Sequence, residues 1–133
     1  MKVCIKNISK THISDSVEVV KDFCQFLQDE MKLENDIHIH FTNNREGDMT
    51  TGVRMPQGEI RILSKGRLLI DILRTLSHEW VHEFQCQKMG VPDDAKIQNI
   101  GGPEENMASV LSAILVKKFQ KRFPEHTEKL YSE

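Results

Sequence analysis

The stretch RLLIDILRTLSHEWVHEFQCQKMG, residues 67–90, decides the fold, because it carries the clearest helical pattern in the chain. Its apolar side chains recur every three or four residues and so share one helix face; they are Leu69, Ile72, Leu73, Leu76 and Trp80. Gly90 followed by Pro92 is typical of a helix ending. The spacing predicts a long helix that packs along this face on the rest of the chain.

Shorter elements precede this helix. Val3 and Ile5 predict a first strand, which could extend to Ile8, and Ser14 or Asp15 offers an N-cap for a helix. The apolar side chains of that helix form one stripe, made of Val17, Val20, Phe23, Cys24, Leu27 and Met31. The chain is therefore predicted to begin with a strand and an amphipathic helix.

Three further strands are predicted between the two helices. Residues 37–41 alternate between apolar and polar, with Ile37, Ile39 and Phe41 inward and both histidines outward. Residues 43–48 then turn, and two more strands at residues 49–55 and 59–63 flank the turn-forming Pro56-Gln57-Gly58. This arrangement favours a small, mainly antiparallel sheet.

A second long helix follows the first. Gly101-Gly102-Pro103 introduces it, Glu104 and Glu105 in its first turn favour the helix dipole, and Pro124 ends it. Its apolar residues are Val110, Leu111, Ile114, Leu115 and Phe119. The order of the elements predicts an α+β fold, and 133 residues without a repeat or linker predict a single domain over residues 1–133.

The composition restricts the classes of function. A formal net charge of -2 excludes the overall basic field that non-specific binding to nucleic acid or anionic membranes requires. No apolar run approaches the roughly 20 residues of a membrane span, and the N-terminus has no long apolar stretch, so we expect a cytoplasmic protein. Cys4, Cys24 and Cys86 lack C-x-x-C spacing, which predicts neither a disulfide framework nor a thiolate zinc site.

The long helix contains His78-Glu79-Trp80-Val81-His82, an H-E-x-x-H motif. Histidines four residues apart lie one helical turn apart on the same face, so both imidazoles can reach one ion. Zinc in a catalytic site takes three protein ligands and keeps a fourth position open. The motif therefore predicts a zinc site whose third ligand comes from elsewhere in the chain.

The third ligand is predicted to be a carboxylate. A metzincin would place a histidine six residues after His82 with a glycine between, but Gln85 and Lys88 occupy those positions. Glu105 follows His82 by 23 residues, which leaves room for a loop and an antiparallel helix that begins near Glu105. The neighbouring Glu104 is the alternative, although it would point about 100° away on a helix.

His78-Glu79-x-x-His82 followed by Glu105-Asn106-Met107-Ala108 resembles the gluzincin metallopeptidases, which pair H-E-x-x-H with a downstream E-x-x-A/S. Within this group the similarity is to minimal intracellular zincins of the ImmA/IrrE type, and it covers roughly residues 59–119. The E-x-x-A pattern of these proteins selects Glu105 rather than Glu104. The resemblance implies a zincin-like fold, in which the H-E-x-x-H helix is followed by a helix carrying the third ligand.

The same resemblance implies Zn²⁺ bound by His78, His82 and Glu105, with Glu79 as the catalytic general base on the zinc-bound water. The implied function is a zinc-dependent metallopeptidase that hydrolyses an intracellular protein or peptide. By analogy with zincins, the strand at residues 59–63 would offer an edge on which an extended peptide pairs. The source organism, the cleavage preference and the oligomeric state stay open.

Two other functions are compatible with the sequence. One is a zinc-binding regulatory or adaptor protein of zincin fold with little or no proteolysis, and the other is a helical interaction domain without metal. Asp71 and Thr75 are candidates for orienting a ligand, because they lie about two turns and one turn before His78 on its face. Arg122, His126 and Tyr131 are candidates for stabilising an oxyanion, although no spacing rule selects among them.

Overall fold

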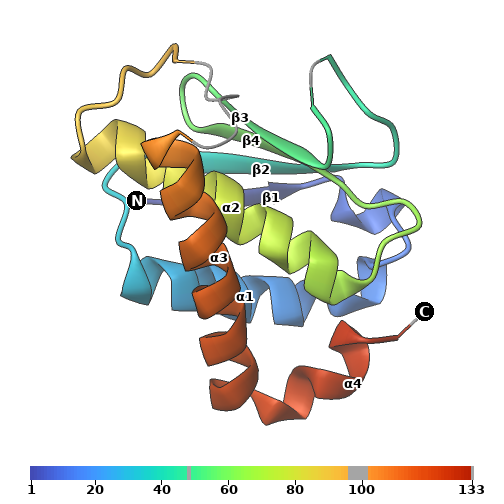
Figure 1. Ribbon diagram of the computed structural model, residues 1–133. Coiled ribbons are helices and arrows are strands. Elements are labelled where there is room, and N and C mark those ends of the chain that lie inside the picture. Colours follow the sequence, from blue (N-terminus) through green and yellow to red (C-terminus); the bar gives the residue numbers. More distant parts are fainter. Residues whose placement is uncertain (48, 96–101, 133) are drawn as a thin grey trace.

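The computed structural model describes residues 1–47, 49–95 and 102–132, which form an α+β fold (Figure 1). Its elements in chain order are β1 (Val3–Lys6), α1 (Val17–Glu30), β2 (Ile37–Thr42), β3 (Gly52–Met55), β4 (Glu59–Leu63), α2 (Leu69–Lys88), α3 (Pro103–Arg122) and α4 (Thr127–Leu130). Short 3-10 helices cover Ile8–Lys10, Ser14–Ser16 and Pro124–His126. Asp48 and Gly101, to which the sequence analysis assigned a turn and a helix start, lie outside the described residues.

The four strands form a mixed sheet in the order β1-β2-β4-β3, which corrects the prediction of a mainly antiparallel sheet. β2 lies parallel to both β1 and β4, and only β3 and β4 are antiparallel. The parallel pairing of β1 and β2 arises because α1 carries the chain back across the sheet between them. The alternation of apolar and polar residues could not predict whether strands pair in parallel or antiparallel, since it indicates only that one face of the sheet is covered.

The strand order also corrects the expectation that residues 59–63 offer a free edge. β4 is paired on both sides, with β2 and with β3. Among the described residues β3 pairs only with β4, so β3 is the outer strand on this side of the sheet. Its position there follows from the hairpin of β3 and β4, in which the returning strand β4 pairs with β2.

The core lies between the sheet and the helices, which pack on one face of the sheet (Figure 1). Ile37, Ile39 and Phe41 are almost fully buried, as the alternation predicted, and Ile60 and Ile62 of β4 are fully buried as well. α1 contributes the predicted stripe, of which Val20, Phe23, Cys24 and Leu27 are buried, as is Met31 directly after the helix. α1 begins at Val17 with Ser16 at the N-cap position, because Ser14–Ser16 forms a 3-10 turn.

The long helix predicted between residues 67 and 90 is α2, and it ends where the sequence indicates. Gly90 takes a left-handed backbone conformation, with φ of 77°, directly after the C-cap at Met89. Trp80 is fully buried, and its indole Nε1 donates a hydrogen bond to the Met31 carbonyl at 2.9 Å. No described helix is long and apolar enough to cross a membrane.

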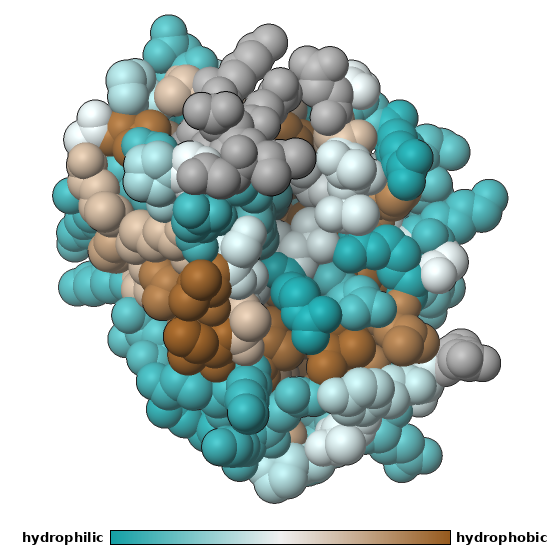
Figure 2. All heavy atoms as spheres, in the orientation of Figure 1, coloured by the Kyte–Doolittle hydropathy of each residue, from teal (hydrophilic) through white to brown (hydrophobic). Residues whose placement is uncertain are grey.

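The apolar residues predicted for helix α3 lie on two faces of the helix. One face is buried against the core and includes Leu115 and Phe119. On another face Val110 and Ile114 remain 59% and 48% exposed. Figure 2 shows hydrophobic surface over the middle of α3 in the same view as Figure 1. The helix therefore buries only part of its apolar surface within this chain.

A buried arginine attaches the outer strand β3 to α2. The guanidinium of Arg54 is 3% exposed, and its Nε donates to Glu83 Oε1 at 2.8 Å. The same guanidinium also donates to the backbone carbonyl and the carboxylate of Asp93, beyond the end of α2. Burial by itself would lower the pKa of Arg54, but the interactions with Glu83 and Asp93 raise it overall, so the charge is retained.

Breaking this buried ion pair from one side is expected to be costly. We expect Arg54→Met to lower the free energy of unfolding by about 3–5 kcal/mol, because it leaves the buried Glu83 carboxylate without its cationic partner. Adding Glu83→Gln should recover part of that loss. The measurement is urea denaturation followed by circular dichroism.

Arg61→Met is the matched control, because Arg61 pairs with Glu46 on the surface, with side chains 34% and 44% exposed. We expect a loss below about 1 kcal/mol for this variant. Equal losses for Arg54→Met and Arg61→Met would contradict the assigned role of Arg54.

Candidate metal centre

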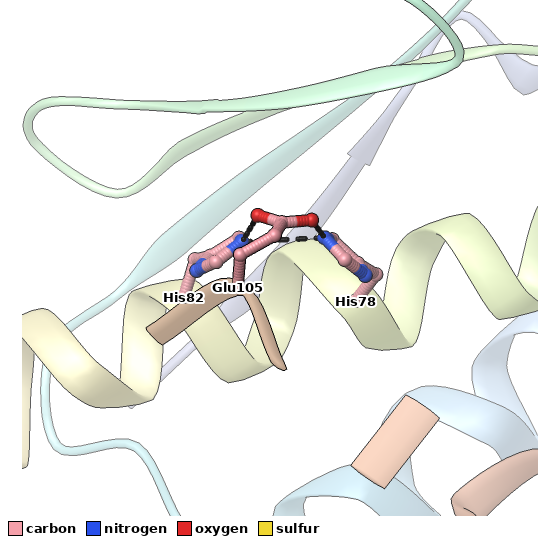
Figure 3. Close-up of side chains that lie close together, drawn as sticks. All are labelled: His78, His82 and Glu105. Carbon is pink, nitrogen blue, oxygen red and sulfur yellow. Dashed lines mark hydrogen bonds and ion pairs between the residues drawn. The ribbon is translucent and has the colours of Figure 1, made fainter. Parts of the chain in front are cut away.

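The two motif histidines and Glu105 meet at one point (Figure 3). His78 Nε2 lies 2.8 Å from Glu105 Oε1, and His82 Nε2 lies 3.0 Å from Glu105 Oε2. The two Nε2 atoms are 3.2 Å apart. Each residue thus offers one ligand atom within 4.8 Å of the other two. Residues that the sequence separates by 23 positions are brought together by the packing of α3 on α2.

These three residues fit a zinc ion in donor type and spacing. Imidazole nitrogen and carboxylate oxygen are ordinary zinc ligands, and ligand atoms about 2.1 Å from a tetrahedral zinc lie about 3.4 Å from one another. The observed separations of 2.8 to 3.2 Å are slightly shorter, as expected for atoms in mutual hydrogen-bond contact. A small outward movement of the side chains would accommodate the ion.

The ligand residues are placed by regular helices. His78 and His82 come from successive turns of α2, and Glu105 comes from the first turn of α3, which begins at Pro103. The side chain of His82 is 5% exposed, whereas those of His78 and Glu105 are 22% and 24% exposed. The centre is therefore closed around His82 and open to solvent near the other two residues.

Burial favours the neutral form of one ligand. Burial lowers the pKa of His78, the charge of Glu105 opposes this shift, and the nearby His82 adds to it. A neutral imidazole is the form that binds a metal, so the environment of His78 keeps it ready for ligation at neutral pH.

Glu79 is a residue of α2, and its side chain lies beside the three ligands and against β3. Its pKa is raised to about 8, first by burial and then by the charge of Glu105, while the backbone N–H of Arg54 partly offsets the rise. A divalent cation bound to the three ligands would attract the carboxylates of Glu79 and Glu105 and so lower the pKa of Glu79. Gly52 of β3 allows the close approach, because a Cβ there would lie 2.4 Å from Thr75 Cγ2 and 3.4 Å from Glu79 Cγ.

Gln85 is a neighbour of the centre that the sequence analysis did not identify. Its Oε1 lies 2.9 Å from His82 Nδ1, and its Nε2 donates to the Glu104 carbonyl at 2.9 Å. The side chain thus connects a ligand on α2 with the first turn of α3. Its position three residues after His82, on the next turn of the same helix, is the sequence signal that could have indicated this contact.

The described contacts of the two proposed ligand-orienting residues go to residues other than the ligands. Asp71 pairs with Arg74 at 3.6 Å, at the surface. Thr75 Oγ1 accepts a hydrogen bond from Arg67 at 2.7 Å and lies 3.5 Å from Thr51 Oγ1. Thr75 therefore helps hold the start of β3 over α2 instead of orienting a histidine.

The three candidates for oxyanion stabilisation are engaged elsewhere, around the C-terminal end of α3. His126 pairs with Asp22 at 2.8 Å, Tyr131 accepts a hydrogen bond from Gln120, and Arg122 lies over the Phe26 ring. None has a described contact with the ligand residues. The sequence could not exclude them, because no spacing rule relates these three residues to Glu105.

Comparisons with protein-family models, with curated proteins and with solved structures found no match to this chain. The interpretation of the centre therefore depends on its own geometry and on the motif.

Metal content is the direct test of the centre. We expect about one zinc per chain in tag-free protein, lost in His82→Ala and in Glu105→Ala because each removes one of three ligands. Glu104→Ala is the matched control, since it removes the adjacent carboxylate and should keep the zinc. Elemental analysis after dialysis measures the result, and zinc retained by Glu105→Ala but lost by Glu104→Ala would contradict the ligand set.

Proposed function

We propose that this protein is a zinc-dependent metallopeptidase of the gluzincin type that hydrolyses a protein or peptide. The convergence of His78, His82 and Glu105 beside the buried Glu79 is the single observation that supports the proposal most. A helix with two chance histidines would not require a carboxylate from another helix within 3.0 Å of both imidazoles.

The residues have distinct roles in the proposed reaction. Bound zinc would polarise the peptide carbonyl and make a nearby water more acidic. Glu79 would take the proton from that water and pass it to the leaving amine. Its carboxylate suits this role because it lies next to the ligands without itself belonging to the set of three.

The packing of α3 gives the E-x-x-A pattern a physical reason. Ala108 is fully buried, one helical turn after Glu105. A larger side chain at this position would push the first turns of α3 away from its neighbours and move Glu105 from the histidines. The small residue thus supports the geometry of the third ligand.

The outer edge of β3 is the proposed binding site for an extended peptide. The Leu63 N–H bonds to the Thr51 carbonyl at 2.8 Å, and hydrogen-bonded pairs alternate along an antiparallel ladder. The backbone groups of Gly52 and Arg54, between those pairs, therefore face away from β4. The Arg54 N–H bonds to the Glu79 carboxylate, so the Gly52 backbone groups and the Arg54 carbonyl are the groups proposed to pair with the substrate. A substrate strand paired there would run along α2 beside Glu79.

The role of Glu79 separates a peptidase from a zinc-binding adaptor. We expect Glu79→Gln to lower kcat at least about 100-fold, because it removes the general base, while zinc content stays at the wild-type level. Asp71→Asn, at the surface of the same helix, should leave activity unchanged. Cleavage of unfolded protein substrates, followed by mass spectrometry, provides the assay. A zinc-loaded wild type that cleaves nothing would favour the adaptor, and wild-type activity in Glu79→Gln would contradict the role of Glu79 as the general base.

If the substrate backbone pairs with β3, its cleavage should depend on which backbone N–H groups are available for hydrogen bonding. We expect N-methylation of a cleaved peptide to lower kcat/KM at alternate positions near the scissile bond, because only every second N–H faces the partner strand. The measurement is a methylation scan of one cleaved peptide. A uniform effect at all positions would argue against strand pairing.

A further inference from the structure

We propose that Gln85 is a positioning residue that sets both His82 and Glu105 for metal binding before the metal arrives. This inference depends on the zinc centre of the proposed function but not on peptidase activity. Gln85 is 1% exposed, so its amide must find its partners within the protein. Those partners are His82 and the backbone of Glu104.

The orientation of the Gln85 amide follows from one of these partners. The Glu104 carbonyl can only accept a hydrogen bond, so the group 2.9 Å away must be the NH₂ of Gln85. The amide oxygen then faces His82 Nδ1 at 2.9 Å, and Nδ1 must carry the proton. In the neutral imidazole this leaves Nε2 with its lone pair.

The nitrogen that keeps its lone pair, Nε2, is the one that faces the candidate metal centre. His82 Nε2 is the nitrogen that lies 3.0 Å from Glu105 Oε2 and 3.2 Å from His78 Nε2. The lone pair of His82 Nε2 therefore faces the point where the three ligand atoms meet, which is where a metal ion would bind. His78 has no comparable support, because its described hydrogen bonds go only to Glu105 and His82.

The second hydrogen bond positions the third ligand. Glu104 precedes Glu105 in the first turn of α3, where the helix has few backbone hydrogen bonds of its own. By holding the Glu104 carbonyl, Gln85 fixes this turn to α2 at the level of His82. One side chain thus sets the tautomer of one ligand and the location of another.

Zinc affinity and the His82 tautomer test the proposal. We expect Gln85→Met, which keeps the volume but removes both hydrogen bonds, to weaken zinc binding about 10- to 100-fold. In the metal-free protein it should also shift His82 away from the Nδ1–H form. Competition with a chromophoric zinc chelator measures the affinity, and ¹⁵N chemical shifts of the imidazole report the tautomer.

Two further variants separate the roles of Gln85. Gln85→Glu keeps the acceptor for His82 but loses the donor to Glu104, so we expect the wild-type tautomer together with faster hydrogen exchange in the first turn of α3. Gln87→Met is the matched control, because Gln87 bonds to Glu83 and to the backbone of Glu34, away from the centre. It should leave zinc affinity unchanged.

The outcomes distinguish this inference from the proposed function. A wild-type tautomer and zinc affinity in Gln85→Met, or an equal loss of affinity in Gln87→Met, would overturn the role of Gln85. A zinc-binding wild type without peptidase activity would contradict only the proposed reaction. If the wild type bound no zinc, the proposed function and the metal-positioning role would both fail, whereas the tautomer would still show whether Gln85 holds His82.

Discussion

The packing of α3 against α2 is the contact on which the candidate metal centre depends. α2 by itself supplies two imidazoles and a possible base, and such a set lacks the third ligand of a catalytic zinc site. Fully buried Ala108 and Phe119 hold α3 in the core, and the first turn of the same helix brings Glu105 to both histidines. The centre is therefore a consequence of core packing as much as of its polar residues.

Buried polar groups around α2 join this core to the outer strand. Arg54 connects β3 to Glu83, and Gly52 lets β3 approach Thr75 and Glu79 closely. A buried ion pair contributes little net stability compared with apolar packing, so its value here lies in fixing one position of β3 over α2. That position decides which backbone groups lie beside Glu79.

Much of the fold could be predicted from periodicity. The ends of α2 and α3 follow from glycine and proline positions, and the inward face of β2 follows from the alternation of apolar residues; these predictions are confirmed. The pairing direction of the sheet was predicted wrongly, because β2 is polar on its outer face whether its neighbours are parallel or antiparallel. The free edge was therefore assigned to β4, although β3 is the outer strand.

The sequence by itself determined the composition of the candidate centre, since His78, Glu79 and His82 are related by helix periodicity alone. Helix periodicity is a local property, so it needs no knowledge of the rest of the chain. Only the tertiary structure decided that Glu105 meets both histidines, that Gln85 connects the two helices and that Arg54 holds β3 over α2. These contacts join residues on different elements, and their distances depend on how the whole core packs.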